Sequence, residues 1–281
     1  MFWAQLKNEL VKLFARKRTY IGFGAFVAFQ VALVAALEIF NAENGVRRLL
    51  KDNGFALEDY YGGLTVGFFI VGFTFFILGS IYLALVSGDI VAKEVEDGTM
   101  RMILSRPVSR LRLLFIKWLG CFIFTCALVL FVGVTSLLTG LLYRHGFGKL
   151  FVFLPEEQIF SMFDASEGMW RYWRAILFLM VTVQTISSLG LMFSCFNIKP
   201  AAATIVTLSV FFVDFVLRLF PFLANYQKYF VTFHVACWAR TLVETPPWPS
   251  IEFSLIFLTA LNLTFWIVGA MRFCSRDFKS S

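Results

Sequence analysis

Long apolar runs, separated by short polar stretches, recur from one end of this chain to the other. Each run has the roughly 20 residues that a helix needs to cross a hydrocarbon layer about 30 Å thick. The runs are unbroken, whereas a membrane-spanning β-strand would alternate apolar and polar positions. We therefore predict an all-α integral membrane protein. Its six spans are expected at about 20–40, 61–86, 113–142, 175–195, 201–220 and 251–271.

The first 18 residues have a different pattern. Their apolar residues recur at helical spacing, and lysines and arginines occupy the rest of the helical wheel. Charges interrupt the apolar positions and no small-residue cleavage site follows them, which is unlike a cleavable signal peptide. We predict an interfacial amphipathic helix over 1–18 that lies on the inner leaflet. The alternative is a cytoplasmic extension of the first span.

Composition and charge support this class and orient the chain. The sequence is 59% hydrophobic with a mean hydropathy of +0.77, outside the range of a soluble domain. Most lysines and arginines lie before the first span, in the stretch 87–112, and after the sixth span. By the positive-inside rule, we expect both termini and the stretch 87–112 to lie on the cytoplasmic side. The membrane is expected to be the plasma membrane of a bacterium, that is, its inner membrane. The sequence has no basic domain of the kind that binds nucleic acid, so we expect no nucleic-acid partner.

The sequence contains no recognisable catalytic or metal-binding pattern. The five cysteines have no paired spacing, and the two histidines lie far apart. A phosphate-binding loop is also missing, because its nearest fragment, Gly148-Lys149-Leu150, has Tyr143 in place of the first glycine. We expect no enzyme activity and no cofactor on this chain. Alternatives from other classes are an ATP-independent channel or carrier and a membrane enzyme.

The charged stretch 87–112 has an ordered pattern. Two acidic residues precede a turn glycine, a threonine can cap a short helix from Met100, three apolar residues share one face of that helix, and a proline ends it. In chain order these residues are Glu94, Glu96, Gly98, Thr99, Met100, Ile103, Leu104 and Pro107. A short helix with an exposed apolar face is suited to the groove of a partner protein.

This order resembles the type-2 ABC exporter permeases, in which such a loop joins the second and third spans. The family pattern is acidic-x-acidic-x-Gly-Thr, an apolar helix, and Leu-Ser-x-Pro-Val-Ser-Arg. It is matched here by Glu94 through Thr99 and by Leu104 through Arg110. The six-span layout, the amphipathic N-terminal helix and a tail with Phe273 and Arg276-Asp277 extend the resemblance over most of the chain.

The resemblance implies a permease subunit that works with a second permease chain, identical or related, and with two cytoplasmic ABC ATPase subunits. ATP and Mg²⁺ would bind to the ATPases. The loop 87–112 would contain the coupling helix, with Met100, Ile103 and Leu104 docked in an ATPase groove. Glu94 and Glu96 would fix the loop against the ATPase. ATP binding would then pull on the loop and switch the spans between two states.

Polar residues inside the spans are candidates for the transport path or for helix pairing. They are Gln30, Gln184, Asp214 and Asn262. Asp214 and Arg218 lie four residues apart and can pair on one helix face, so a structural role is favoured for them. Gln184 and Asn262 are expected to form hydrogen bonds between helices.

The segment 221–250 is expected to be re-entrant or interfacial, and to act either as an outer gate or as an aromatic anchor. The 36 phenylalanines are compatible with a hydrophobic cargo and equally with lipid-facing helices. The cargo therefore stays open.

Overall fold

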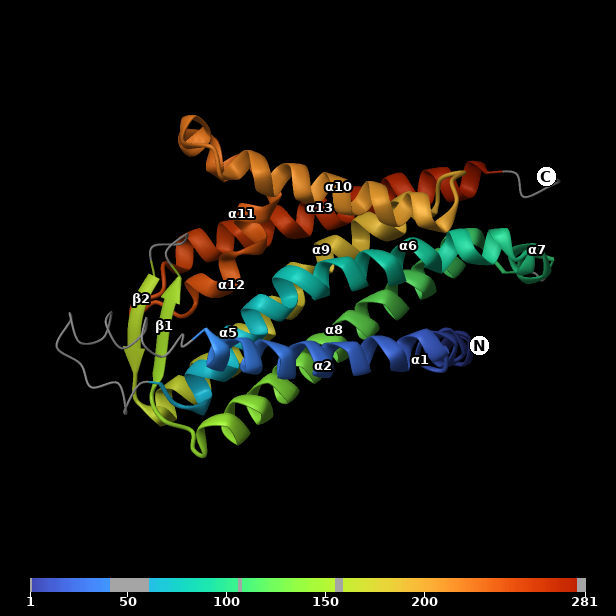
Figure 1. The fold of residues 1–281 in the computed structure, drawn as a ribbon. Coiled ribbons are helices and arrows are strands. Elements are labelled where there is room, and N and C mark those ends of the chain that lie inside the picture. The colour runs from blue at the N-terminus through green and yellow to red at the C-terminus, as the bar shows by residue number, and fades with distance from the viewer. Residues whose placement is uncertain (1, 41–60, 106–107, 155–158, 277–281) are drawn as a thin grey trace.

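Six helices long and apolar enough to cross a membrane form the body of the protein, which confirms the predicted all-α class (Figure 1). The structure is a computed structural model that describes residues 2–40, 61–105, 108–154 and 159–276; Pro107 and Asp277 lie outside these ranges. The spanning helices are α2 (Lys17–Ile39), the continuous α5 (Gly63–Thr74), η1 (Phe75–Gly79) and α6 (Ser80–Glu96), then α8 (Arg110–Arg144), α9 (Ala165–Ser194), α10 (Pro200–Arg218) and α13 (Trp248–Ser275).

Most of the helices extend beyond the predicted apolar runs. α8 begins at Arg110, and α9 begins at Ala165, well before the expected start near 175. Hydropathy marks only the part of a helix that suits lipid, whereas the backbone hydrogen bonds continue through polar residues at its ends. The short η1 segment is a π-helical turn that interrupts the second span.

The N-terminal segment is a separate helix, α1 (Phe2–Phe14), rather than a continuation of α2. Arg16 has an extended conformation, with φ −68° and ψ 132°, so the chain bends between the two helices. Leu6, Glu9 and Leu13 form the buried face of α1, and this helix packs against α8. The opposite face, including Trp3 and Val11, is exposed.

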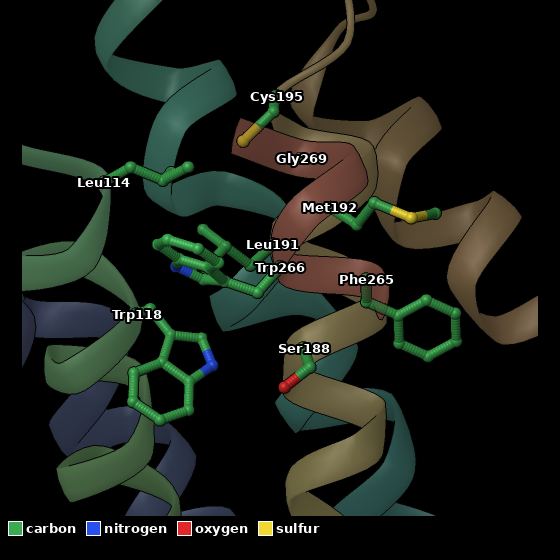
Figure 2. Close-up of a pocket in the computed structure, with 9 residues that line it drawn as sticks. All are labelled: Leu114, Trp118, Ser188, Leu191, Met192, Cys195, Phe265, Trp266 and Gly269. Carbon is green, nitrogen blue, oxygen red and sulfur yellow. The ribbon is translucent and has the colours of Figure 1, made fainter. Parts of the chain in front are cut away.

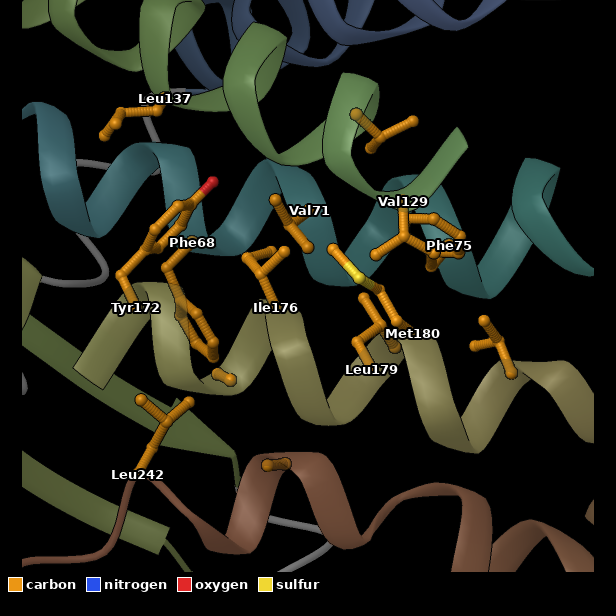
Figure 3. Packing of buried hydrophobic residues seen from close by; sticks show 14 of the residues in the cluster. Phe68, Val71, Phe75, Val129, Leu137, Tyr172, Ile176, Leu179, Met180 and Leu242 are labelled. Atoms are coloured by element: carbon orange, nitrogen blue, oxygen red, sulfur yellow. The ribbon is translucent and has the colours of Figure 1, made fainter. Parts of the chain in front are cut away.

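The core is centred on α9, which packs against α6, α8, α10 and α13. Figure 3 shows side chains of this cluster, among them Phe68, Val71, Phe75, Val129, Leu137, Tyr172, Ile176, Leu179, Met180 and Leu242. The buried Tyr172 hydroxyl donates a 2.7 Å hydrogen bond to the carbonyl oxygen of Gly133 on α8. This bond satisfies the polar atom of the largest buried side chain in the core.

α6 and α9 approach each other closely at Gly190. A Cβ atom at this position would overlap the Oγ of Ser87. Four residues further along α9, the Ser194 hydroxyl accepts hydrogen bonds from the backbone amides of Val91 (3.0 Å) and Ala92 (2.8 Å) on α6. The crossing is thus fixed by both packing and hydrogen bonds.

A small β-hairpin, which the sequence pattern did not predict, lies at one end of the bundle. Strand β1 (Leu150–Leu154) pairs antiparallel with β2 (Ile159–Phe163), with Leu150 opposite Phe163. The Thr65 hydroxyl of α5 donates to the carbonyl of Lys149 and accepts from the amide of Phe151. The hairpin is therefore attached to the start of the second span.

The segment 221–250 also lies toward this end. It folds into η3 (Pro221–Tyr229), α11 (Val231–Val235) and α12 (Cys237–Arg240). The two ends of the described chain and the short helix α7 (Thr99–Leu104) lie together at the opposite end (Figure 1). The molecule thus has an α7 end and a hairpin end.

Candidate functional site: the short helix between the second and third spans

The site begins where α6 ends. Gly98 has φ 71°, a left-handed conformation that glycine adopts without strain, and it turns the chain from α6 into the six-residue α7. The expectation that Thr99 caps a helix beginning at Met100 is wrong in detail. The helix begins at Thr99 itself, and the Thr99 hydroxyl donates to the carbonyl of Glu94, 3.1 Å away.

The two faces of α7 differ in burial. Met100, Ile103 and Leu104 do share one face, but that face packs against the body of the protein. Met100 is only 1% exposed and belongs to the same buried cluster as Leu113 and Phe273, with Ile103 and Leu104 packed against it. Met100 therefore anchors α7 to the spans, instead of lying free for a partner as the sequence suggested.

The face of α7 that points outward carries other residues. Met102 is 66% exposed, and Arg101 and Ser105 are exposed beside it. Glu96 and Asp97, at the end of α6, are also exposed, and both interact with Lys93. The outward surface thus combines one long apolar side chain with charges of both signs. We call Glu96, Asp97, Arg101, Met102 and Ser105 the α7 surface.

Glu94 points inward and belongs to a cluster of four charges. The Lys117 ammonium lies 2.8 Å from Glu94 Oε2 and 3.4 Å from Glu9 Oε2, while Lys12 Nζ lies 3.2 Å from Glu94 Oε1 and 3.1 Å from Glu9 Oε1. Lys117 also donates to the carbonyl of Ile90, 3.3 Å away. We call Glu9, Lys12, Glu94 and Lys117 the charge quartet; it joins α1, α6 and α8.

The quartet balances two positive and two negative charges in a mostly buried position. Lys117 is fully buried, and Glu9 and Glu94 are 7% and 6% exposed. Burying an ion is costly unless opposite charges and hydrogen bonds compensate it. Burial lowers the pKa of Lys12, but the attraction of Glu94 and Glu9 outweighs it and raises the pKa above its ordinary value. Glu94 therefore fixes the loop to α1 and α8 of this chain, in place of the contact with an ATPase expected from sequence.

Two arginines connect the start of α8 with other helix ends. Arg110 Nη1 donates to the carbonyls of Cys274 (2.7 Å) and Arg276 (2.9 Å), at the end of α13. The guanidinium of Arg276 donates to the carbonyl of Phe196 (3.0 Å) and to Asn197 Oδ1 (2.7 Å), in the turn after α9. Arg110, from the loop motif, thus binds the C-terminal end of α13, and Arg276, from the tail motif, binds the turn that follows α9.

Sequence reasoning missed most of the partners in these contacts. Glu9 and Lys12 lie far from the loop in sequence, as does Arg18, which pairs with Asp89 on α6. Lys117 lies only five residues beyond the loop, but its carboxylate partners were not identified. Lys117 itself could have indicated such a contact, because it lies in an otherwise apolar stretch, and a buried lysine needs a carboxylate to compensate its charge. Nothing in the local pattern indicates which carboxylate that is.

The polar residues inside the spans have different surroundings. Asn262 on α13 donates to the hydroxyl of Thr185 on α9, 3.3 Å away, an interhelical bond. Gln30 and Gln184 are buried, and their amide groups have no hydrogen-bond partner within the described part of the chain. The expected interhelical bond is therefore found for Asn262 and not for Gln184. The Asp214 carboxylate accepts from the amides of Val231 (3.0 Å) and Thr232 (2.7 Å), at the start of α11.

Arg218 extends this connection between α10 and α11. Its guanidinium donates to the carbonyl of Thr232, 3.3 Å away. Asp214 and Arg218 therefore act on a common target, the first turn of α11. Further along α11, the buried His234 donates from Nε2 to the carbonyl of Lys228 (2.9 Å) and lies 3.0 Å from the Ser254 hydroxyl on α13. Burial lowers the pKa of His234 below its ordinary value.

A narrow slot lies in the seam between α8, α9 and α13 (Figure 2). Its lining consists of Leu114, Trp118, Ser188, Leu191, Met192, Cys195, Phe265, Trp266 and Gly269. The indole nitrogens of Trp118 and Trp266 and the hydroxyl of Ser188 are buried, and none has a hydrogen-bond partner in the described ranges. Leaving such a group unsatisfied costs about 1–3 kcal/mol.

Within the described residues, no three His, Cys, Asp or Glu side chains come together as a metal site. All five cysteines lie in these ranges, and none forms a disulfide.

Comparison with known proteins gives two matches. The family described as "ABC-2 family transporter protein" matches residues 4–232, most of the chain. A curated relative, the uncharacterized protein YhcI of Bacillus subtilis, is 25% identical over 168 residues, in a match that covers 48% of this chain and 54% of the relative. The chain thus spans about half the length of that relative, whose name states no activity.

Proposed function

This chain belongs to the ABC-2 transporter family as a multi-pass membrane subunit, and we propose that it is the permease of an ATP-driven exporter. Two ABC ATPase subunits on other chains would bind ATP and Mg²⁺. A second permease chain, identical or related, would complete the path through the bacterial inner membrane. Both termini would lie in the cytoplasm, at the same end as α7.

The observation that carries this proposal is that one face of α7 is attached to the body of the protein while the other face is exposed. A helix that transmits force must present one face to its partner and be fixed firmly to the body on the other. The α7 surface supplies the outward face, with Met102 as its apolar centre. Met100 and Glu94 supply the inward attachment, through the buried cluster and the charge quartet.

This arrangement supports a specific sequence of events. Closure of the two ATPases on ATP would displace α7 through the α7 surface. Because Glu94 is joined to Lys117 on α8 and to Lys12 on α1, the displacement would pass to those helices together. Ligand-driven switching requires such an element with two arrangements, whose balance the ligand shifts.

Substitutions on the α7 surface test the proposal. Arg101→Glu combined with Met102→Asp reverses a charge and places a second one at the apolar centre, without touching the buried face of α7. At a docking centre such changes weaken binding by about 2 kcal/mol or more, roughly 30-fold. We expect the ABC ATPase to be lost from the affinity-purified complex.

The matched control makes the same kind of change elsewhere at the α7 end. Lys7→Glu combined with Val11→Asp alters the exposed face of α1, where Val11 is 54% exposed. This variant should retain the ATPase. Undiminished co-purification of the ATPase with the α7 variant would remove α7 from the docking role.

A further inference from the structure

α7 ends at Leu104, and Arg110 is the first residue of the next helix, α8. Its guanidinium donates to the carbonyls of Cys274 and Arg276, at 2.7 Å and 2.9 Å. The last carbonyls of a helix lack partners within the helix and carry partial negative charge, so a guanidinium binds them strongly. The start of α8 is thereby fastened to the end of α13.

A second arginine continues the connection. Arg276, whose carbonyl accepts from Arg110, uses its own guanidinium to bind Phe196 O at 3.0 Å and Asn197 Oδ1 at 2.7 Å. Those two residues lie in the turn between α9 and α10. Two arginines in series therefore join the helix ends of α8, α13 and α9.

Deeper along the same seam, the packing provides less support. In the slot between α8, α9 and α13, the indole N–H groups of Trp118 and Trp266 and the hydroxyl of Ser188 are buried without partners among the described residues (Figure 2). Such groups disfavour the present arrangement of the seam relative to any arrangement that satisfies them. The seam is therefore a place where α8 and α13 can separate unless their ends are held.

We propose that Arg110 and Arg276 are positioning residues that make the α7 ends of α8, α13 and α9 move as one body. When α7 is displaced, Arg110 would carry the movement to α13, and Arg276 would carry it on to the α9–α10 turn. The inference rests on the proposed function, because an ATPase must supply the displacement. It extends that function to spans that the charge quartet does not reach.

We call this transfer of movement through Arg110 and Arg276 the relay. Distance measurements between α8 and α13 test it. Spin labels are placed at Phe115 on α8 and Met271 on α13, both exposed, after the five native cysteines are replaced. Replacing Cys274 leaves its backbone carbonyl in place. The complex with its co-purifying ABC ATPase is reconstituted in vesicles and measured without nucleotide and with ATP plus vanadate. With Arg110 present, the label distance should be the same in both conditions.

Arg110→Ala should uncouple the two helices. Addition of ATP and vanadate should then shift or broaden the distance between the labels at 115 and 271 by about 2 Å or more, the scale of helix displacements in such switches. Arg110→Lys keeps a charged donor and should restore the fixed distance. Arg112→Ala removes the same charge from the first turn of α8, where no bond from its guanidinium to α13 is found in the described ranges, and should behave as the unmodified chain.

Arg276→Ala gives a second arm that does not depend on the folding of the Arg110 variant. Labels at Met271 and Ala201 should separate on ATP addition, while the pair at 115 and 271 stays fixed. An unchanged distance in both alanine variants, with ATP still hydrolysed by the complex, would overturn the relay and leave the proposed function standing. Absence of an ABC ATPase from the purified unmodified chain would instead refute the proposed function.

Discussion

At the scale of single residues, Lys117 has the most unusual environment. Its ammonium group is fully buried yet lies within 3.4 Å of two carboxylates. Lys12 contacts the same two carboxylates, but 44% of its side chain is exposed. The two lysines therefore form a natural pair for separating the effect of burial from that of charge.

Lys117→Met should destabilise the protein far more than Lys12→Met. Removing one member of a buried ion pair leaves its partner charged and poorly compensated, at a cost of about 3–5 kcal/mol. An exposed pair contributes about 0–1 kcal/mol. Unfolding of both variants by SDS in mixed micelles gives the comparison, and equal losses would contradict the argument that burial makes Lys117 more important than Lys12.

The sequence predicted correctly which residues share a helix face, but not whether that face is buried or exposed. The helical period correctly put Met100, Ile103 and Leu104 on one face of α7, and Asn262 was correctly expected to join two helices. Periodicity identifies which residues share a face but not whether the protein's own spans cover that face. For this reason Met100 and Glu94 were assigned outward, although side chains of other helices cover both of them.

At the scale of elements, close helix crossings depend on single small residues. Gly190 allows α9 to approach α6 where a Cβ would overlap Ser87. Gly24 on α2 offers the contrast, since a Cβ there would have nothing within 4 Å.

Gly190→Ala should therefore destabilise the protein by about 1–3 kcal/mol, the usual cost of overpacking a core. Gly24→Ala should be neutral or stabilising by up to about 1 kcal/mol, because alanine favours helix more than glycine does. Thermal unfolding in detergent, followed for both variants, distinguishes the two sites. A loss at Gly24 as large as that at Gly190 would contradict the packing argument.

The spanning helices were predictable from sequence, because the bilayer imposes length and hydropathy on each span separately. The hairpin β1–β2 was not, since its two five-residue strands lack the alternation of an exposed strand and depend on Thr65 of a distant helix. A separate N-terminal helix was expected from the apolar residues that recur at helical spacing in 1–18, and the bend at Arg16 agrees with it. The placement of that helix on the inner leaflet stays a prediction.

At the scale of the whole molecule, the α7 end and the hairpin end should lie on opposite sides of the membrane. The basic residues gather toward the α7 end, which the positive-inside rule assigns to the cytoplasm. In a background without native cysteines, expressed without the ABC ATPase that would cover the α7 surface, Arg101→Cys should react with an impermeant thiol reagent only in inside-out vesicles. Phe147→Cys, at a position 50% exposed near the hairpin, should react only in intact cells. The reverse pattern would invert the proposed topology.

The 35 residues of α8 rise by about 52 Å at roughly 1.5 Å per residue, against a hydrocarbon core about 30 Å thick. A helix of this length must extend beyond the hydrocarbon core on one or both sides of the membrane, or cross the bilayer at a tilt. A change of only about 5° in its inclination would displace one tip by about 4–5 Å relative to the other, by the same rise per residue. A small rotation of α8 at Arg110 would therefore displace Arg144, at the other end of the helix, by several ångströms.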